Sequence, residues 1–194
     1  MTLTRFRLIA CAALLLLLAG CATPGGKLQK AGQAQAFDIT LDSPLDWARI
    51  KGYRSETWTI DGQSLNQLNI YSQVKPGEHV MLRGKQKKSR PDGPWFKAGM
   101  RGDEIRDIVV DAYRELNWTR ISTQNLRPAD FAGTSGYRFD LVMTEPNGLV
   151  YQGTAAVAVR GGNLDLLVWI APREHYYGRD IDEVNSMLDR MRFM

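Results

Sequence analysis

Three strand-like stretches in the C-terminal third of the chain, in which apolar residues recur at every second position, constrain its fold most strongly. They cover residues 137–144, 149–160 and 163–170. A period of two residues is typical of β-strands, and the connections contain Asn147-Gly148 and Gly161-Gly162, which suit tight hairpin turns. The pattern therefore predicts a three-stranded antiparallel meander. Its third strand is apolar on both faces, which predicts a sheet that is covered on both sides.

Two amphipathic segments are predicted to provide that cover. In residues 102–117 the apolar side chains recur at helical spacing, and acidic residues occupy the first turn, where the helix dipole favours negative charge. A second helix is predicted to begin near Asp180 and to present an apolar stripe that ends near Met191. A central antiparallel sheet with helices on it belongs to the α+β class.

The region before the first helix divides into strands and a loop. Short alternating runs predict strands at residues 36–40, 56–60 and 65–72, and Asp61-Gly62 predicts a hairpin between the last two. Residues 75–99 are rich in Lys, Arg, Gly and Pro, and we interpret them as a long exposed loop. Trp95-Phe96 at its end could either be exposed or fix the loop to the core.

The N-terminus has the features of an export signal. Arg5 and Arg7 precede an almost wholly apolar run over residues 8–19, which is shorter than the roughly 20 residues needed to span a bilayer and fits a signal peptide. The run ends in Leu18-Ala19-Gly20-Cys21, which resembles the bacterial lipobox. We therefore predict a signal peptide at residues 1–20, a lipidated Cys21 with a flexible tether at 21–35, and one globular domain at 36–194.

The expected location follows from that processing. Ala22, and not Asp, follows Cys21. By resemblance to the sorting pattern of Gram-negative lipoproteins, this residue favours the outer membrane, with the domain facing the periplasm and the N-terminal lipid, palmitate included, in the membrane. Several acyl chains on one residue anchor stably, because each buried CH₂ contributes about 0.8 kcal/mol.

Cysteine count and charge exclude several classes of site. Cys11 lies within the predicted signal peptide and Cys21 would carry lipid, so the mature domain has no disulfide, cysteine nucleophile or thiolate metal site. The sequence holds 25 Lys+Arg and 21 Asp+Glu. Removal of Arg5 and Arg7 leaves 23 against 21, a balance that gives no basic footprint for nucleic acid.

From Leu41 to its end, the chain resembles the PsbP-like family. The order of elements matches, and three local pieces are similar: 132–139, Tyr151-Gln152-Gly153, and Ile170-Ala171-Pro172 with Tyr176-Tyr177. The family includes lumenal extrinsic proteins of photosystem II, a Ran-binding nuclear-transport factor and bacterial lipoproteins. The resemblance implies an α/β/α sandwich around an antiparallel sheet and a role in binding protein partners. It implies no catalytic residue, because the family shares no catalytic site.

The sequence offers little for catalysis or cofactor binding. His79 and His175 are the two histidines, and neither is near a G-x-S-x-G motif, which the chain lacks. We find no zinc, P-loop or dinucleotide-binding motif and predict no metal and no cofactor. The main prediction is a protein that is not an enzyme. A hydrolase of envelope polymers that uses paired carboxylates stays open, because such pairs converge in space without a local motif.

Two surfaces are candidates for binding. The first follows the third meander strand and gathers charge and aromatic area, as binding hot spots do: Arg173, Glu174, His175, Tyr176, Tyr177 and Arg179. The second is a basic run that could contact anionic lipid headgroups: Lys85, Lys87, Lys88 and Arg90. The first surface would serve a protein or cell-envelope partner, and the second a structural, lipid-contacting role. The structural alternative for the first surface is that its tyrosines cap the sheet and its charges are solvated. For the second surface it is a solvated, mobile loop.

Overall fold

The computed structural model describes residues 26–194 and contains two antiparallel sheets. The main sheet has, in spatial order, β1 (Lys27–Gln29), β4 (Trp47–Lys51), β5 (Ser55–Thr59), β6 (Gln67–Val74), β10 (Asn163–Pro172), β9 (Val150–Arg160), β8 (Thr134–Thr144) and β7 (Thr119–Phe131). The small sheet has the order β11 (Arg192–Phe193), β3 (Ile39–Ser43) and β2 (Gly32–Ala36). The helical elements are α2 (Gly102–Glu115), the π-turn η1 (Arg173–Tyr177) and α3 (Gly178–Asp189).

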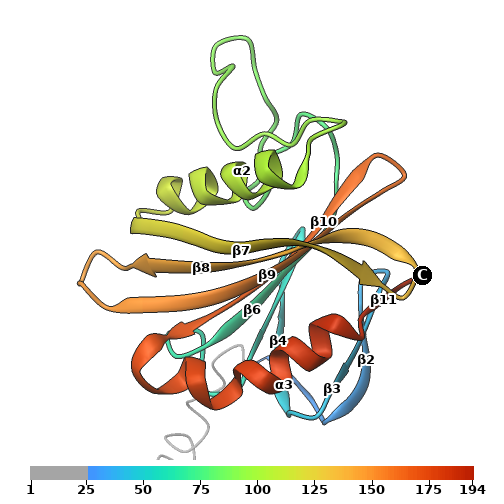
Figure 1. Cartoon of the computed structure of the whole chain (residues 1–194), viewed down its shortest axis with the longest axis vertical. Helices are drawn as coiled ribbons and strands as arrows, with labels where there is room; N and C mark the ends of the chain where they lie inside the picture. Colours follow the sequence, from blue (N-terminus) through green and yellow to red (C-terminus); the bar gives the residue numbers. More distant parts are fainter. Residues whose placement is uncertain (1–25) are drawn as a thin grey trace, which may run out of the picture.

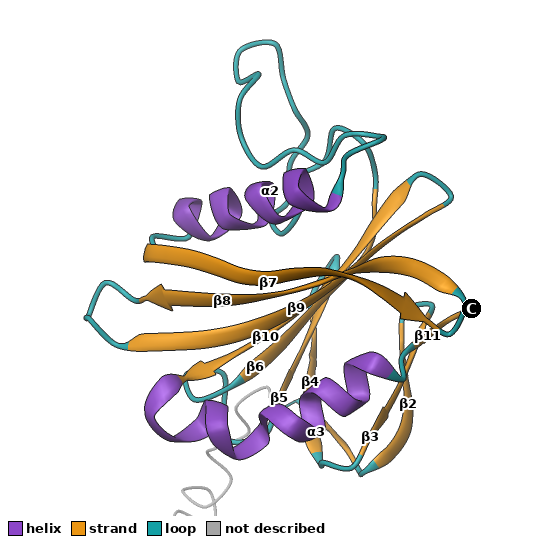
Figure 2. Ribbon diagram, viewed as in Figure 1, coloured by secondary structure: helices purple, strands orange, loops and turns teal. Residues whose placement is uncertain are grey.

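The main sheet is the middle layer of the molecule. Helix α2 covers one of its faces, while α3 and the small sheet cover the other (Figures 1 and 2). Each face has its own hydrophobic core: Ile105 and Val109 of α2 pack on one side, and Val184 and Leu188 of α3 on the other. Strand β10 contributes to both cores, since Val168 faces α2 and Trp169 faces α3. The α+β class and the central antiparallel sheet are thus confirmed, and the small sheet is an addition.

The predicted meander corresponds to β8, β9 and β10. Strand β9 lies between its two neighbours, pairing Ala156 with Arg138 on one side and with Leu167 on the other. The predicted helix at 102–117 is α2, and the predicted β5–β6 hairpin forms around Asp61-Gly62. The last helix begins at Gly178, two residues before the predicted start.

The predicted tether is wrong from residue 27 onward. Within the range 21–35, residues 27–29 form β1 at the edge of the main sheet, and most of β2 follows. Strand β2 pairs with β3 and turns Ala34 and Ala36 into the core while its glutamines face solvent. The small side chains of β2 bury little area by themselves, but the strand is stabilised by its pairing with β3 and by packing of its alanines in the core. The signal peptide at 1–20 and Cys21 lie outside the described residues.

Two further predictions need correction. The strand expected at 36–40 is interrupted by a tight turn at residues 37–38, with Phe37 at a φ of 55°, so that Ala36 ends β2 and Ile39 begins β3. The loop 75–99 is only partly exposed, because Val80, Met81, Trp95 and Phe96 are buried beneath it. Part of this loop projects beyond α2 (Figure 1). In the part of the chain that the structure describes, no helix combines the length and the apolar character that crossing a bilayer requires.

Candidate binding surfaces

The predicted cluster at 173–179 forms a continuous surface at the start of α3. Tyr177 packs on the fully buried Trp169, with ring centroids 5.2 Å apart. Burial raises the pKa of Tyr177 to about 12, so its hydroxyl stays protonated. Tyr176 lies between His175, at 5.0 Å in an edge-to-face contact, and the guanidinium of Arg179, 5.2 Å from its ring centroid. Both tyrosines are half-buried and therefore fixed in orientation.

Arg179 connects this surface to the β5–β6 hairpin. Its guanidinium forms ion pairs with Asp61 of the hairpin and with Asp180, the latter at 2.7 Å. The hydrogen bond from Arg179 lowers the pKa of Asp61 below its usual value. The remaining predicted residues, Arg173, Glu174 and His175, are exposed. The structure thus brings the six predicted residues together and adds Asp61, which sequence spacing could not indicate.

The four cations of the basic run at 85–90 differ in their contacts. Lys85, Lys87 and Lys88 are exposed on the loop. Arg90 turns back to the body of the protein, where its Nη2 lies 2.5 Å from Glu115 Oε1 and its guanidinium lies over Trp95. Of the four predicted cations, Arg90 therefore contributes to the attachment of the loop.

The buried His79 attaches the same loop to the end of α2. Its Nδ1 accepts hydrogen bonds from the backbone N–H groups of Met81 and Leu82, and its Nε2 lies 3.1 Å from Glu115 Oε2. These contacts fix the neutral tautomer with its proton on Nε2, which donates to Glu115. Burial lowers the pKa of His79, against the opposing effect of Glu115. Since both ring nitrogens are engaged, His79 acts here as a structural tie.

Two carboxylates converge between the main sheet and the β2–β3 turn. The hydroxyl of Ser72 lies 2.7 Å from Asp38 Oδ1 and 2.8 Å from Asp165 Oδ1, and Arg160 forms ion pairs with both aspartates. Asp165 has 0% of its surface exposed. Partial burial alone would raise the pKa of Asp38, but Arg160 and Ser72 together lower it. Through Ser72 and Arg160, the two aspartates join the β2–β3 turn to the main sheet.

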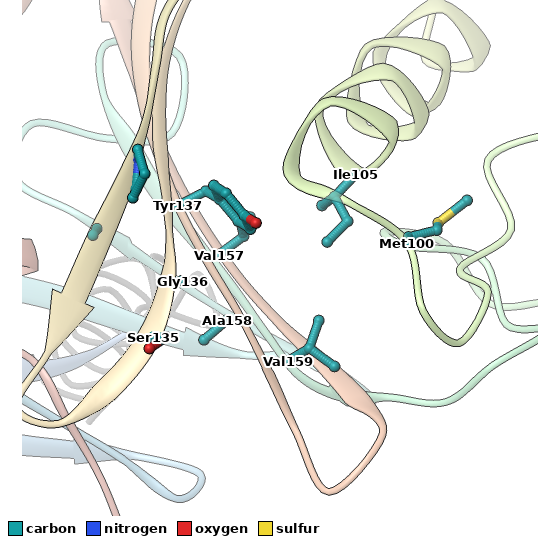
Figure 3. Close-up of a pocket in the computed structure, with 10 residues that line it drawn as sticks. Met100, Ile105, Ser135, Gly136, Tyr137, Val157, Ala158 and Val159 are labelled. Carbon is teal, nitrogen blue, oxygen red and sulfur yellow. The ribbon is translucent and has the colours of Figure 1, made fainter.

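A pocket of about 330 Å³ lies between the start of α2 and strands β7, β8 and β9. Figure 3 shows the ring of Tyr137 on the strands opposite Ile105 of α2. Apolar side chains dominate its walls: Met100, Ile105, Pro128, Val157 and Val159. Its volume lies at the lower end of the range for small-molecule sites, about 300–1,000 Å³. Sequence reasoning missed it, because its walls come from four separate segments with no shared motif.

A metal site needs several His, Cys, Asp or Glu side chains grouped around one point. Between residues 26 and 194, no three His, Cys, Asp or Glu side chains are grouped so that they could hold an ion. Asp38 and Asp165 are instead paired with Arg160 and Ser72, and His79 is paired with Glu115 and two backbone N–H groups.

The comparisons with known proteins concern the fold. No protein-family model and no curated protein matches the chain. The solution structure of the cyanobacterial PsbP protein CyanoP from Synechocystis sp. PCC 6803 is similar with a TM-score of 0.55, over 90% of this chain and 96% of that one, at 8% identity. A crystal structure from Bacteroides thetaiotaomicron covers 86% of this chain at 10% identity and a TM-score of 0.47, and the chain spans 49% of that protein. The likeness to CyanoP concerns the fold alone, and the fold of this chain is PsbP-like.

Proposed function

We propose that this chain is a lipoprotein that is anchored in the outer membrane through acylated Cys21, and that its folded domain binds a protein or cell-envelope component in the periplasm. The observation that carries the anchoring is the order of features in the sequence. Arg5 and Arg7, the apolar run and Leu18-Ala19-Gly20-Cys21 follow one another directly, and the first strand begins only six residues after Cys21.

The cluster at 173–179 is the surface that we assign to the partner. Tight binding is favoured when anchor side chains lose little freedom on association. Tyr177 on Trp169, and Tyr176 between His175 and Arg179, are held in this way before any partner arrives. The exposed charges beside them can then supply orientation and specificity. This combination of fixed aromatic rings and exposed charges supports a binding role.

Photo-crosslinking in cells tests this function with the full-length chain. A photoreactive amino acid replaces the exposed His175 in one variant and the exposed Leu149, in the β8–β9 turn, in a control. We expect a discrete adduct from position 175 and none from 149. The adduct should be lost in the double variant Arg173→Glu, Tyr176→Ala while the amount of chain in the envelope is unchanged. Equal adducts from both positions, or an adduct that survives the double variant, would contradict the assignment.

A further inference from the structure

The point at which the chain enters the fold is defined by β1. Lys27 pairs with Arg49 of β4, and a Cβ added to Gly26 would lie 2.6 Å from the carbonyl oxygen of Arg49 and 2.9 Å from the side chain of Ile50. Gly26 therefore lies directly against the end of β4. The next residues along β4 lead into the β4–β5 turn, which contains Tyr53.

The length of chain between Cys21 and β1 restricts how the domain can lie, an inference that rests on the proposed function. Six Cα–Cα steps separate Cys21 from Lys27. A chain extends at most about 3.5 Å per residue, so β1 can be no farther than about 20 Å from an acylated Cys21. The β4–β5 end of the main sheet must then be close to the lipid headgroups.

The side chains around this point have the character of a membrane-contacting surface. Tyr53 is 77% exposed and Leu28 is 59% exposed. Arg83, from the loop between β6 and α2, lies with its guanidinium 4.2 Å from the ring centroid of Tyr53, and its neighbour Leu82 is 40% exposed. Tyrosines and apolar side chains of this kind are favoured at the boundary between headgroups and acyl chains.

The cations at this end divide into paired and unpaired groups. Arg49 is paired with Glu56 at 2.5 Å, and Arg54 with Glu78 at 2.5 Å. Among residues 26–194, by contrast, Lys27, Lys51 and Arg83 form no ion pair with a carboxylate. All three are exposed, so their charge is available to anionic phosphate groups.

We propose that these residues form a docking surface for an anionic phospholipid bilayer, which we call the exit surface: Lys27, Leu28, Lys51, Tyr53, Leu82 and Arg83. The acyl anchor would bring the surface to the bilayer, and the exposed side chains would fix the orientation of the domain. Tyr53 and Asp61 lie at opposite ends of β5, about 25 Å apart along an extended strand. Docking would therefore direct the surface at 173–179, which Arg179 ties to Asp61, away from the bilayer.

Lipid quenching of site-specific labels tests this orientation. The full-length chain, isolated with its lipid, is reconstituted into phosphatidylethanolamine vesicles with or without phosphatidylglycerol that carry a quencher in the headgroup region. Fluorescent labels are attached in the variants Tyr53→Cys, Leu82→Cys and Leu149→Cys. Leu149 is a matched control, because it is 40% exposed, as is Leu82. In vesicles with phosphatidylglycerol we expect quenching at 53 and 82 to exceed that at 149 several-fold.

Charge reversal tests whether the exit surface contacts lipid in a chain that keeps its acyl anchor. The triple variant Lys27→Glu, Lys51→Glu, Arg83→Glu should lower quenching at Leu82→Cys to the level of the control position. The triple variant Lys97→Glu, Arg120→Glu, Arg192→Glu changes the net charge equally at other exposed positions and should leave quenching unchanged.

The outcomes distinguish this inference from the proposed function. If the chain co-floats with the vesicles but the labels at 53 and 82 are quenched no more than the label at 149, the exit surface is wrong while anchoring stands. Quenching that is equal with and without phosphatidylglycerol would overturn the choice of an anionic bilayer. A chain that does not co-float overturns the anchoring and, with it, this inference.

Discussion

Several charged side chains inside this protein are used to join its layers. Arg138 of β8 is almost fully buried, and it donates to the carbonyl oxygen of Ala155, to Thr154 Oγ1 and to Asn185 and Asp189 of α3. Buried charges of this kind are tolerated when every donor has a partner. Arg138 connects α3 to the sheet, Arg160 connects the two sheets, and His79 connects the loop to α2.

The His79 contact predicts a dependence of stability on pH. Burial lowers the pKa of His79 from its ordinary value of 6.5, so the unfolded chain binds a proton at a higher pH than the folded chain does. The contribution of neutral His79 to the free energy of unfolding is fully present above about pH 6.5. Below this pH the free energy of unfolding should fall, until the pH has passed the lower pKa that His79 has in the folded state. Urea unfolding at several values between about pH 8 and pH 5.5 measures this slope.

A substitution of His79 tests whether this residue causes the change of unfolding free energy with pH. His79→Gln should reduce the fall in unfolding free energy between about pH 8 and pH 5.5. It should also destabilise the protein at the higher pH, because the contacts to Met81, Leu82 and Glu115 are lost. The same substitution at the exposed His175 controls for the loss of a histidine elsewhere. An unchanged slope in His79→Gln would show that His79 is not the group responsible.

At the scale of elements, the sequence predicted the helix and strands in which the spacing of apolar residues reflects burial. Helix α2 and strands β8, β9 and β10 have regular apolar positions because each presents one or both faces to a core. Strand β7 was missed, because it lies at the sheet edge and is largely exposed on both faces. Strands β1 and β2 were also missed, since glycine, glutamine and alanine carry little pattern and tertiary pairing alone selects the strand conformation.

Part of the candidate site could also be predicted from the sequence. The cluster at 173–179 is contiguous in the sequence, so it was found from residue types. Asp61, the pocket beneath α2 and the exit surface were not found, because each depends on segments that the fold brings together. In particular, the contact of Tyr53 with Arg83 depends on how the loop between β6 and α2 returns to the sheet.

The assignment of β2 as a strand, and not as a tether, is directly testable. Ala36 is 1% exposed and packs in the core on the α3 side, so Ala36→Asp would bury an unpaired carboxylate. We expect it to lower the free energy of unfolding by more than about 3 kcal/mol. Gln33→Asp, on the solvent-facing side of the same strand, should change it by less than about 0.5 kcal/mol. Equal, small effects of both substitutions in urea unfolding would mean that this segment does not pack.

At the scale of the whole molecule, β5 separates the two surfaces that we propose for membrane contact and partner binding. The exit surface lies beside the β4–β5 turn, and the surface at 173–179 lies beside the β5–β6 hairpin. The main sheet, covered on both faces, provides a rigid connection between them. A domain of this design would present its partner surface at a fixed height above the membrane. With the proposed anchor at Cys21, the strands near the N-terminus would hold the domain closer to the membrane than a tether through residue 35 would.

The whole account depends on acylation of Cys21, which intact-mass measurement of the chain purified from bacterial envelopes tests most directly. The account predicts a polypeptide that begins at Cys21 and carries the added mass of acyl chains on that residue. A polypeptide that retains Met1, or one that begins near Cys21 without any acyl mass, would contradict it.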